Sequence, residues 1–202
     1  MVATASIEVL SGRAVEPAIP DLARLRITVF RDFPYLYDGD LDYERQYLRK
    51  FADLPESTVV VARDGAEAVG ASTALPMLRA GKEVAEPFRA RGLDPAQFYY
   101  LGESVLLPAY RGQGIGVAFF RHREERARAF GYRHATFCAV DRPPDHPRRP
   151  VGYVPLDAFW THRGYVKHPE LVATFEWKEL DEPDESAKTL TFWVKDLAGS
   201  GA

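Results

Sequence analysis

The chain is poor in cysteine, carries little net charge and has no long hydrophobic run. Its one cysteine, Cys138, excludes an internal disulfide framework and suits a reducing compartment. The formal charge of -3 gives no general attraction to nucleic acid or to a membrane surface. Residues 1–12 lack the basic and apolar regions of a signal peptide, and no apolar segment approaches a membrane span. We therefore expect a cytoplasmic protein without nucleic-acid or membrane partners.

Histidine is also scarce, and its spacing is not that of metal ligands. The 5 histidines are scattered along the chain, so no metal site is expected. What the chain does contain is typical of a globular protein, since 46% of its residues are hydrophobic and 12% are aromatic. A length of 202 residues fits a single domain over residues 1–202.

Hydrophobic periodicity predicts short strands that alternate with helices. Strands are expected at residues 6–10, 58–63, 66–75, 97–107, 134–140, 171–177 and 189–195. Helices are expected from residue 20, at about 40–51, at 114–130 and at 156–162, with residues 79–95 partly helical. Only the strands on either side of the helix at 114–130 form a clear βαβ unit, and hairpins connect the others. This order predicts a mixed, mostly antiparallel α/β sheet with helices on both faces.

The most informative segment is Leu106–Gly116, where a strand stops at a proline and a glycine loop opens directly into a helix. Backbone N–H groups and the positive end of the helix dipole meet at that point, and both favour a bound phosphate group. The segment is not a P-loop, because Val117 and Ala118 follow the last glycine where lysine and serine or threonine are needed. It is not a dinucleotide fingerprint either, because Val117 occupies the position of the third glycine.

The pattern Arg111-x-x-Gly114-x-Gly116, after a strand ending in proline, resembles the acyl-CoA pyrophosphate loop of the GNAT (Gcn5-related N-acetyltransferase) superfamily. The resemblance extends from the hairpin at 58–75 to the segment 159–166 and covers most of the chain. It implies a GNAT-like fold with its acyl-CoA core at about residues 57–166. It also implies direct transfer of an acetyl or short acyl group from acetyl-CoA to a primary amine of a small molecule or peptide, within a ternary complex. The alternative is a non-catalytic acyl-CoA-binding sensor or interaction domain.

The same resemblance implies where acetyl-CoA binds. Pantetheine is expected to pair with the backbone of Val105, Leu106 and Leu107 like an added strand. The N–H of Leu106 or Leu107 could also polarise the thioester carbonyl. The pyrophosphate is expected to contact the backbone of Arg111, Gly112, Gln113, Gly114, Ile115, Gly116 and Val117.

Glu103 is the candidate general base. It lies in the strand before the loop, among mostly apolar neighbours, where a carboxylate is uncommon without a functional reason. The resemblance implies that a glutamate on this strand deprotonates the attacking ammonium, directly or through water. A carboxylate held in a salt bridge at the rim of the strand is the structural alternative.

The general acid is not assigned by the sequence. The family usually has a tyrosine four residues before the glycine of the turn, and Trp160 occupies that position here. An indole N–H is not a practical proton donor. Tyr153, Tyr165 or solvent could replace the tyrosine, or no acid is needed because thiolate is a tolerable leaving group.

Four further features have both a functional and a structural interpretation. Cys138 lies in an apolar strand and is expected to fill the core rather than carry an acyl group. The aromatic residues 33–37 either shape the acceptor pocket or pack in the core. The strand at 189–195 could form a homodimer if its edge is exposed. The arginines of the loop helix are expected on a solvated face, with the option that one meets the 3′-phosphate of CoA; they are Arg121, Arg123, Arg126 and Arg128.

Overall fold

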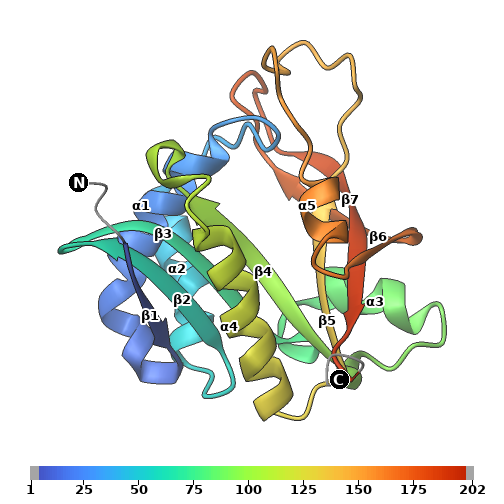
Figure 1. Ribbon diagram of the computed structural model, residues 1–202. Coiled ribbons are helices and arrows are strands. Elements are labelled where there is room, and N and C mark those ends of the chain that lie inside the picture. Colours follow the sequence, from blue (N-terminus) through green and yellow to red (C-terminus); the bar gives the residue numbers. More distant parts are fainter. Residues whose placement is uncertain (1–4, 199–202) are drawn as a thin grey trace.

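The computed structural model describes residues 5–198 and contains a seven-stranded sheet in the order β1-β2-β3-β4-β5-β7-β6 (Figure 1). The strands are β1 (Ser6–Leu10), β2 (Thr58–Asp64), β3 (Glu67–Pro76), β4 (Phe98–Leu106), β5 (His134–Val140), β6 (Val166–Trp177) and β7 (Ser186–Asp196). The helices are α1 (Ile19–Phe30), α2 (Leu41–Ala52), α3 (Lys82–Arg89), α4 (Ile115–Ala129) and α5 (Asp157–Thr161). Among residues 5–198, no helix has both the length and the apolar character needed to cross a bilayer.

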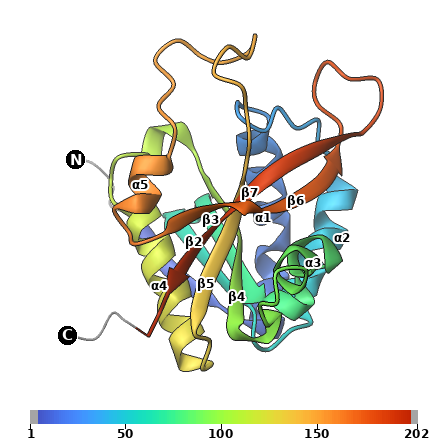
Figure 2. The same cartoon turned by 90° about the vertical axis from the view of Figure 1, so that its right-hand side faces the viewer.

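The predicted mixed α/β sheet is confirmed. All neighbouring strands are antiparallel except β4 and β5, which run parallel and are joined by α4. Helices α1, α2 and α3 cover one face, and α4 and α5 cover the other (Figure 2). Each helix buries an apolar side against the sheet, for example Leu22 of α1, Phe88 of α3 and Phe119 of α4.

The condition for dimerisation through residues 189–195, an exposed strand edge, is not met. The strand containing these residues, β7, lies between β5 and β6 and pairs with both, so a second chain cannot pair with it. The strand predicted at 171–177 begins earlier, at Val166. Its pairing with β7 is interrupted between His168 and Val172, and the part before the interruption was not predicted. Pro169 and Glu170 in that interruption break the alternating pattern that marks a strand in the sequence.

The prediction of a solvated arginine face on α4 is wrong for Arg123. Its side chain is only 1% exposed, and the neighbouring Glu124 is also buried. Phe119, Arg123 and Ala127 are spaced four residues apart, so all three lie on the side of the helix that packs on the sheet. Arg121 is exposed, as expected.

Candidate active site

Strands β4 and β5 pair only at their beginnings and then separate. The paired residues are Phe98–Tyr100 of β4 and His134–Thr136 of β5, whereas the strands continue to Leu106 and Val140. Figure 1 shows the two strands diverging towards the loop that precedes α4. Beyond Tyr100, β4 is therefore paired with β3 on one side only, and backbone groups on its other side are left for another partner.

A β-bulge in β4 decides the direction in which Glu103 points. Ser72 of β3 pairs with Ser104, but Ala74 pairs with Leu101, so two β4 residues lie opposite Thr73. Regular alternation would place Glu103 on the α4 face with Leu101. The extra residue instead turns Glu103 towards α1 and α2, where it meets Arg26.

Glycine is needed on the first bulge residue. A Cβ at Gly102 would lie 2.7 Å from the Oγ1 atom of Thr73, closer than such atoms approach in proteins. The backbone of Gly102 thus lies too close to the side chain of Thr73 for a Cβ to fit without a shift.

The carboxylate of Glu103 is held by an ion pair inside the protein. Its Oε2 atom is 2.9 Å from Nη1 of Arg26, and the hydroxyl of Tyr47 lies 3.4 Å from the same oxygen. The side chain is 6% exposed, and its Oε1 atom has no hydrogen-bond partner. The salt bridge predicted as the structural alternative thus exists, but it is buried and leaves one buried carboxylate oxygen without a hydrogen-bond partner.

The two candidate N–H donors at the end of β4 differ. The N–H of Leu107 donates to the carbonyl of Val69 at 2.9 Å, so it is not available to a ligand. Because hydrogen-bonding direction alternates along a strand, the backbone groups of Leu106 and Ser104 face away from β3. Leu106 is therefore the donor directed to the unpaired side of β4. Val105 is buried and pairs with Ala71.

The glycine loop has the backbone conformation of an anion site. Gly112 and Gly114 have φ angles of 75° and 83°, and a Cβ at either position would meet no atom within 4 Å. Gly114 is the N-cap of α4 and provides no side-chain hydrogen bond to the helix start. The first N–H groups of α4 therefore have no side-chain cap at Gly114.

Side chains around the loop hold it without filling it. Tyr110 donates a hydrogen bond to Asp64 of β2 at 2.8 Å, and Ile115 is buried in the core. Gln113 donates to the carbonyl of Ala109 at 3.0 Å. Val117 is 46% exposed, and Arg111, Gly112, Gln113 and Gly114 are exposed. Gly116 packs against Phe159, which a Cβ would approach to 3.5 Å.

Trp160 and Tyr165 both belong to the core under α4. The ring of Trp160 lies 5.0 Å from that of Phe137 and 5.2 Å from that of Trp193. Tyr165 is 1% exposed and donates to Glu124 at 3.0 Å, and burial raises its pKa well above the usual value. Of the two tyrosines named as acid candidates, only Tyr153 is outside this cluster, and its ring contacts Phe33 at 4.8 Å.

Cys138 is inert in this environment. It is 7% exposed, its Sγ atom is 3.2 Å from the hydroxyl of Tyr100, and burial raises its pKa to about 12. A thiol with this pKa is almost fully protonated at neutral pH and is a poor nucleophile. Among residues 5–198, no cluster of three or more His, Cys, Asp or Glu side chains has an arrangement that could hold a metal ion.

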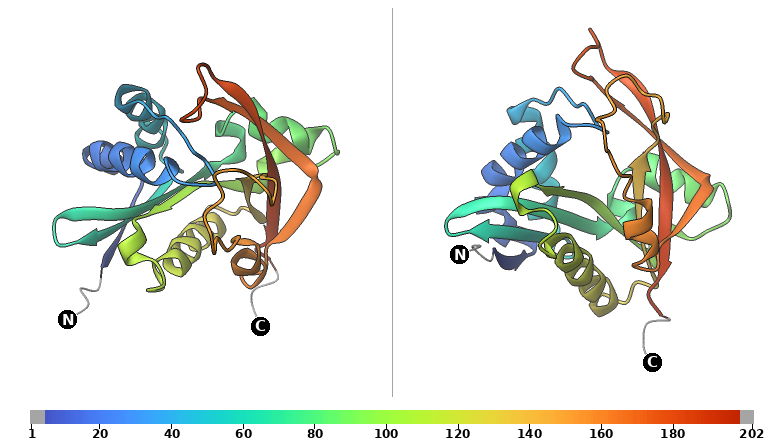
Figure 3. Two further views of the ribbon diagram at one scale, coloured as in Figure 1. Left: turned by 90° about the horizontal axis from the view of Figure 1, so that it is seen from above. Right: turned by 45° about the horizontal axis from the view of Figure 1, so that its top comes forward.

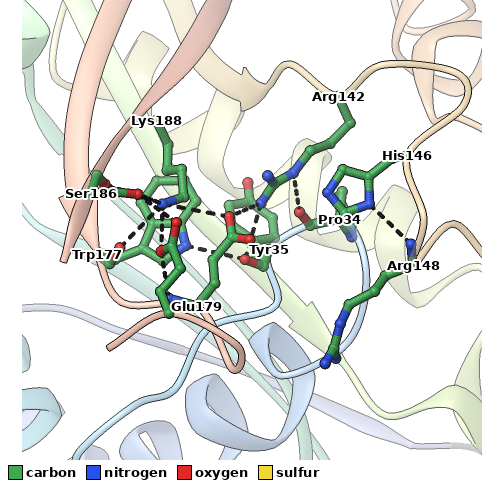
Figure 4. A network of polar contacts seen from close by, with 10 residues as sticks. Pro34, Tyr35, Arg142, His146, Arg148, Trp177, Glu179, Ser186 and Lys188 are labelled. Atoms are coloured by element: carbon green, nitrogen blue, oxygen red, sulfur yellow. Dashed lines mark hydrogen bonds and ion pairs between the residues drawn. The ribbon is translucent and has the colours of Figure 1, made fainter. Parts of the chain in front are cut away.

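Three segments meet near the separated ends of β4 and β5, and we call this group the clasp: residues 33–38, 142–153 and 177–188. Arg142 joins them, since it donates to the carbonyls of Pro34 at 2.6 Å and Tyr35 at 3.2 Å and pairs with Glu179 at 2.5 Å (Figure 4). Its side chain is 11% exposed. Figure 3 shows the three segments converging when the molecule is viewed from above.

Backbone pairing adds to the clasp. The N–H of Asp38 donates to the carbonyl of Lys178, and that of Leu180 donates to the carbonyl of Leu36, both at 2.9 Å. Tyr35 connects the clasp to the surroundings of Glu103, because its ring lies 4.6 Å from that of Phe30, and the Phe30 ring lies 5.1 Å from the guanidinium carbon of Arg26, which pairs with Glu103. Burial raises the pKa of the Tyr35 phenol. The aromatic segment at 33–37 thus lies at the candidate site.

The sequence analysis did not identify several residues around Glu103, although the position of two of them in the helix pattern indicates burial. Arg26 follows Leu22 by four residues on the buried side of α1. Glu44 lies four residues before Leu48 on the buried side of α2. A charged residue at an apolar position of a helix indicates a buried partner. Arg142 and Glu179 left no such signal, because they are far apart in the sequence.

The comparisons with known proteins agree with this geometry. Residues 22–152 match the model of the Acetyltransferase (GNAT) family. The N-acetyltransferase from Staphylococcus aureus Mu50 aligns with a TM-score of 0.59 at 14% identity, over 95% of this chain and 99% of its own. A Salmonella typhimurium protein described as an acetyltransferase, solved with its cofactor acetyl-CoA, gives 0.58 at 11% identity, over 98% of this chain and 97% of its own.

A third structure, ribosomal-protein-alanine N-acetyltransferase from Brucella melitensis, gives a TM-score of 0.60 at 16% identity, over 95% of this chain and 99% of its own. At these identities the structures establish the fold alone. No curated protein matches the sequence at a significant level. The family model covers well over half of the chain, and the chain therefore belongs to the GNAT acetyltransferase family.

Proposed function

We propose that this chain is an N-acetyltransferase that moves an acetyl or short acyl group from acetyl-CoA to a primary amine of a small molecule or peptide. The observation that carries the proposal is the continuity between the unpaired end of β4 and the open glycine loop at the start of α4. Together they offer an extended backbone edge for an amide chain and a cluster of N–H groups for phosphates.

The described residues fit acetyl-CoA. Gly112 and Gly114 hold left-handed conformations with no atom near the Cβ position, so a pyrophosphate could approach the backbone closely. The start of α4 has no side-chain cap that would compete with an anion. Leu106 directs its backbone groups to the side of β4 where pantetheine would add as a strand.

Glu103 and Leu106 would divide the chemistry between them. The free Oε1 atom of Glu103 would accept the proton of the attacking ammonium, directly or through water. The N–H of Leu106 would donate to the thioester oxygen as negative charge develops there. We assign no side chain as the acid, because Trp160 and Tyr165 are packed in the core and a thiolate leaves readily.

The buried, protonated thiol of Cys138 supports direct attack of the amine rather than a covalent acyl-enzyme. In such a mechanism both substrates occupy the site together. The clasp is the part of the chain that would contact the acceptor, because Tyr35 connects it through Phe30 to the Arg26–Glu103 pair and supplies an aromatic side chain there.

The experiment measures release of free CoA thiol from acetyl-CoA in the presence of several primary amines. The panel contains a polyamine, an amino-acid ester, an arylalkylamine and a peptide with a free N-terminus. We expect turnover with at least one amine and a loss of 10²- to 10⁴-fold, as is typical for removal of a general base, in Glu103→Gln. Glu86→Gln is the matched control, since this carboxylate is exposed on α3.

Two results would contradict the proposal. Tight binding of CoA without turnover of any amine would favour a non-catalytic acyl-CoA-binding domain. Unchanged activity in Glu103→Gln would remove Glu103 as the base while leaving the donor site in place.

A further inference from the structure

Two buried carboxylates share one guanidinium beside the unpaired end of β4. Arg26 of α1 contacts Glu103 through Nη1 at 2.9 Å and Glu44 of α2 through Nε. The side chains of Arg26, Glu44 and Glu103 are 12%, 0% and 6% exposed. The group thus contains two carboxyl groups and one guanidinium, all largely out of contact with water. Burying charged groups costs free energy unless they are paired, so this arrangement calls for an explanation.

We propose that Arg26 and Glu44 are positioning residues that set, in opposite directions, how strongly Glu103 holds a proton. This inference rests on the proposed function, in which Glu103 is the general base. Arg26 favours the ionised form of Glu103 by attraction. Glu44 disfavours it, because it repels the charge of Glu103 and occupies part of the same guanidinium.

The arrangement also fixes which oxygen reacts. Arg26 and Tyr47 both contact Oε2 of Glu103, while Oε1 has no hydrogen-bond partner. The rings of Tyr47 and Phe30 lie 4.4 and 5.1 Å from the guanidinium carbon of Arg26 and hold it in place. Burial alone would lower the pKa of Arg26, but the neighbouring carboxylates raise it, so the guanidinium stays charged.

Other charged or titratable groups surround Glu103, and they stay constant in the experiment below. Burial lowers the pKa of Lys50 to about 8, and its Nζ atom lies 3.7 Å from the centre of the Tyr47 ring. Arg123 approaches from α4 and contacts the carbonyl of Glu103 rather than its carboxylate. The phenols that interact with this group are Tyr47, which contacts Glu103, together with Tyr35 and Tyr37, and burial raises the pKa of all three.

The test follows the titration of Glu103 in four proteins: wild type, Glu44→Gln, Arg26→Met and the control Glu86→Gln. The chain is labelled with ¹³C at glutamate carboxyl groups, and the signal missing from Glu103→Gln identifies Glu103. We expect its midpoint to fall by about half a pH unit or more in Glu44→Gln and to rise by about one unit or more in Arg26→Met. Glu86→Gln should not move it.

The acid limb of kcat/KM should move in the same two directions, measured with acetyl-CoA and the fastest amine of the panel. A merely structural role would lower activity at every pH without moving the limb. If Arg26→Met fails to fold, Glu44→Gln still tests the inference, because glutamine has nearly the same shape as glutamate and this variant is expected to fold. A Glu103 midpoint in Glu44→Gln equal to or above that of wild type would overturn the inference.

The NMR titration separates this inference from the proposed function. If Glu103→Gln leaves the acid limb unchanged, the base assignment fails, whatever the midpoint does. If Glu103→Gln removes the limb but Glu44→Gln leaves the midpoint in place, only the inference fails.

Discussion

The guanidinium of Arg123 lies 3.1 Å from the carbonyl oxygen of Glu103, so a residue of α4 holds the backbone of the candidate base from the opposite face of the sheet. The same side chain donates to the carbonyl of Thr73 at 3.2 Å and to the hydroxyl of Ser104 at 2.9 Å. These contacts surround the β-bulge that turns Glu103 towards Arg26. Arg123 thus supplies hydrogen bonds where the bulge interrupts the regular pairing of β3 and β4.

Arg123→Met should lower the free energy of unfolding by about 3 kcal/mol, because the carbonyl oxygens of Thr73 and Glu103 and the hydroxyl of Ser104 would lose their donor. Urea denaturation followed by fluorescence measures the change. Arg121→Met is the matched control on the exposed side of the same helix, with an expected change within about 0.5 kcal/mol. Equal effects of the two substitutions would show that Arg123 does not hold the bulge.

Gly114→Ala and Gly116→Ala should change stability in opposite directions. Gly114 has a φ of 83°, where alanine is strained, so this substitution should cost about 1–2 kcal/mol. Gly116 lies in the first turn of α4, and a Cβ there would meet Phe159 at an ordinary 3.5 Å. Alanine at that position should stabilise the protein by about 0.5 kcal/mol. Thermal unfolding without ligand checks both signs, and strain at residue 114 is refuted if Gly114→Ala melts no lower than wild type.

Arg142→Ala should raise KM for the amine by about tenfold or more while changing KM for acetyl-CoA by less than about twofold. The reason is that Arg142 joins the three segments of the clasp, whereas the glycine loop is on the other side of β4. Initial rates at varied concentrations of each substrate provide the measurement. Arg148→Ala tests the same loop at an exposed ion pair with Asp181 and should have little effect on either constant. A larger change in KM for acetyl-CoA than for the amine would count against a clasp on the acceptor side.

Cys138→Ser should keep kcat within about threefold of wild type, because a thiol with a pKa of about 12 does not carry the acyl group. Serine also preserves a polar partner for the hydroxyl of Tyr100. The companion measurement is labelling of the native protein with iodoacetamide at pH 7.5, which should be very slow. Loss of activity in Cys138→Ser, together with parallel lines in double-reciprocal plots, would point to an acyl-enzyme instead.

Much of the fold could be predicted from the sequence, because the strong signals were local. The Asp64-Gly65 turn between apolar runs predicted the β2–β3 hairpin, and the glycines around residue 114 predicted the start of α4. The proposed acetyl-CoA site could be inferred from the sequence for the same reason, since it consists of consecutive backbone groups.

The part of the chain proposed to bind the acceptor was harder to predict from the sequence, because it depends on contacts between distant segments. Arg142 and Glu179 meet only after the sheet has formed, and neither residue is unusual in its own segment. The direction in which the Glu103 side chain points depends on a β-bulge, and Gly102 is the only sign of that bulge in the neighbouring sequence. Whether residues 189–195 form a sheet edge could not be predicted from the sequence, because strand order is a property of the whole topology rather than of β7 itself.

The position of β7 also constrains how the protein can be made. β7 is the last strand along the described chain, yet β6 has no other neighbour in the sheet, and β5 is joined on that side only to β7. During synthesis, β1 to β4 can pair with one another before the rest of the chain is made, whereas β6 can join the sheet only once residues 186–196 are available. The half of the molecule proposed to bind acetyl-CoA can thus form early, and the half that would select the amine is completed last.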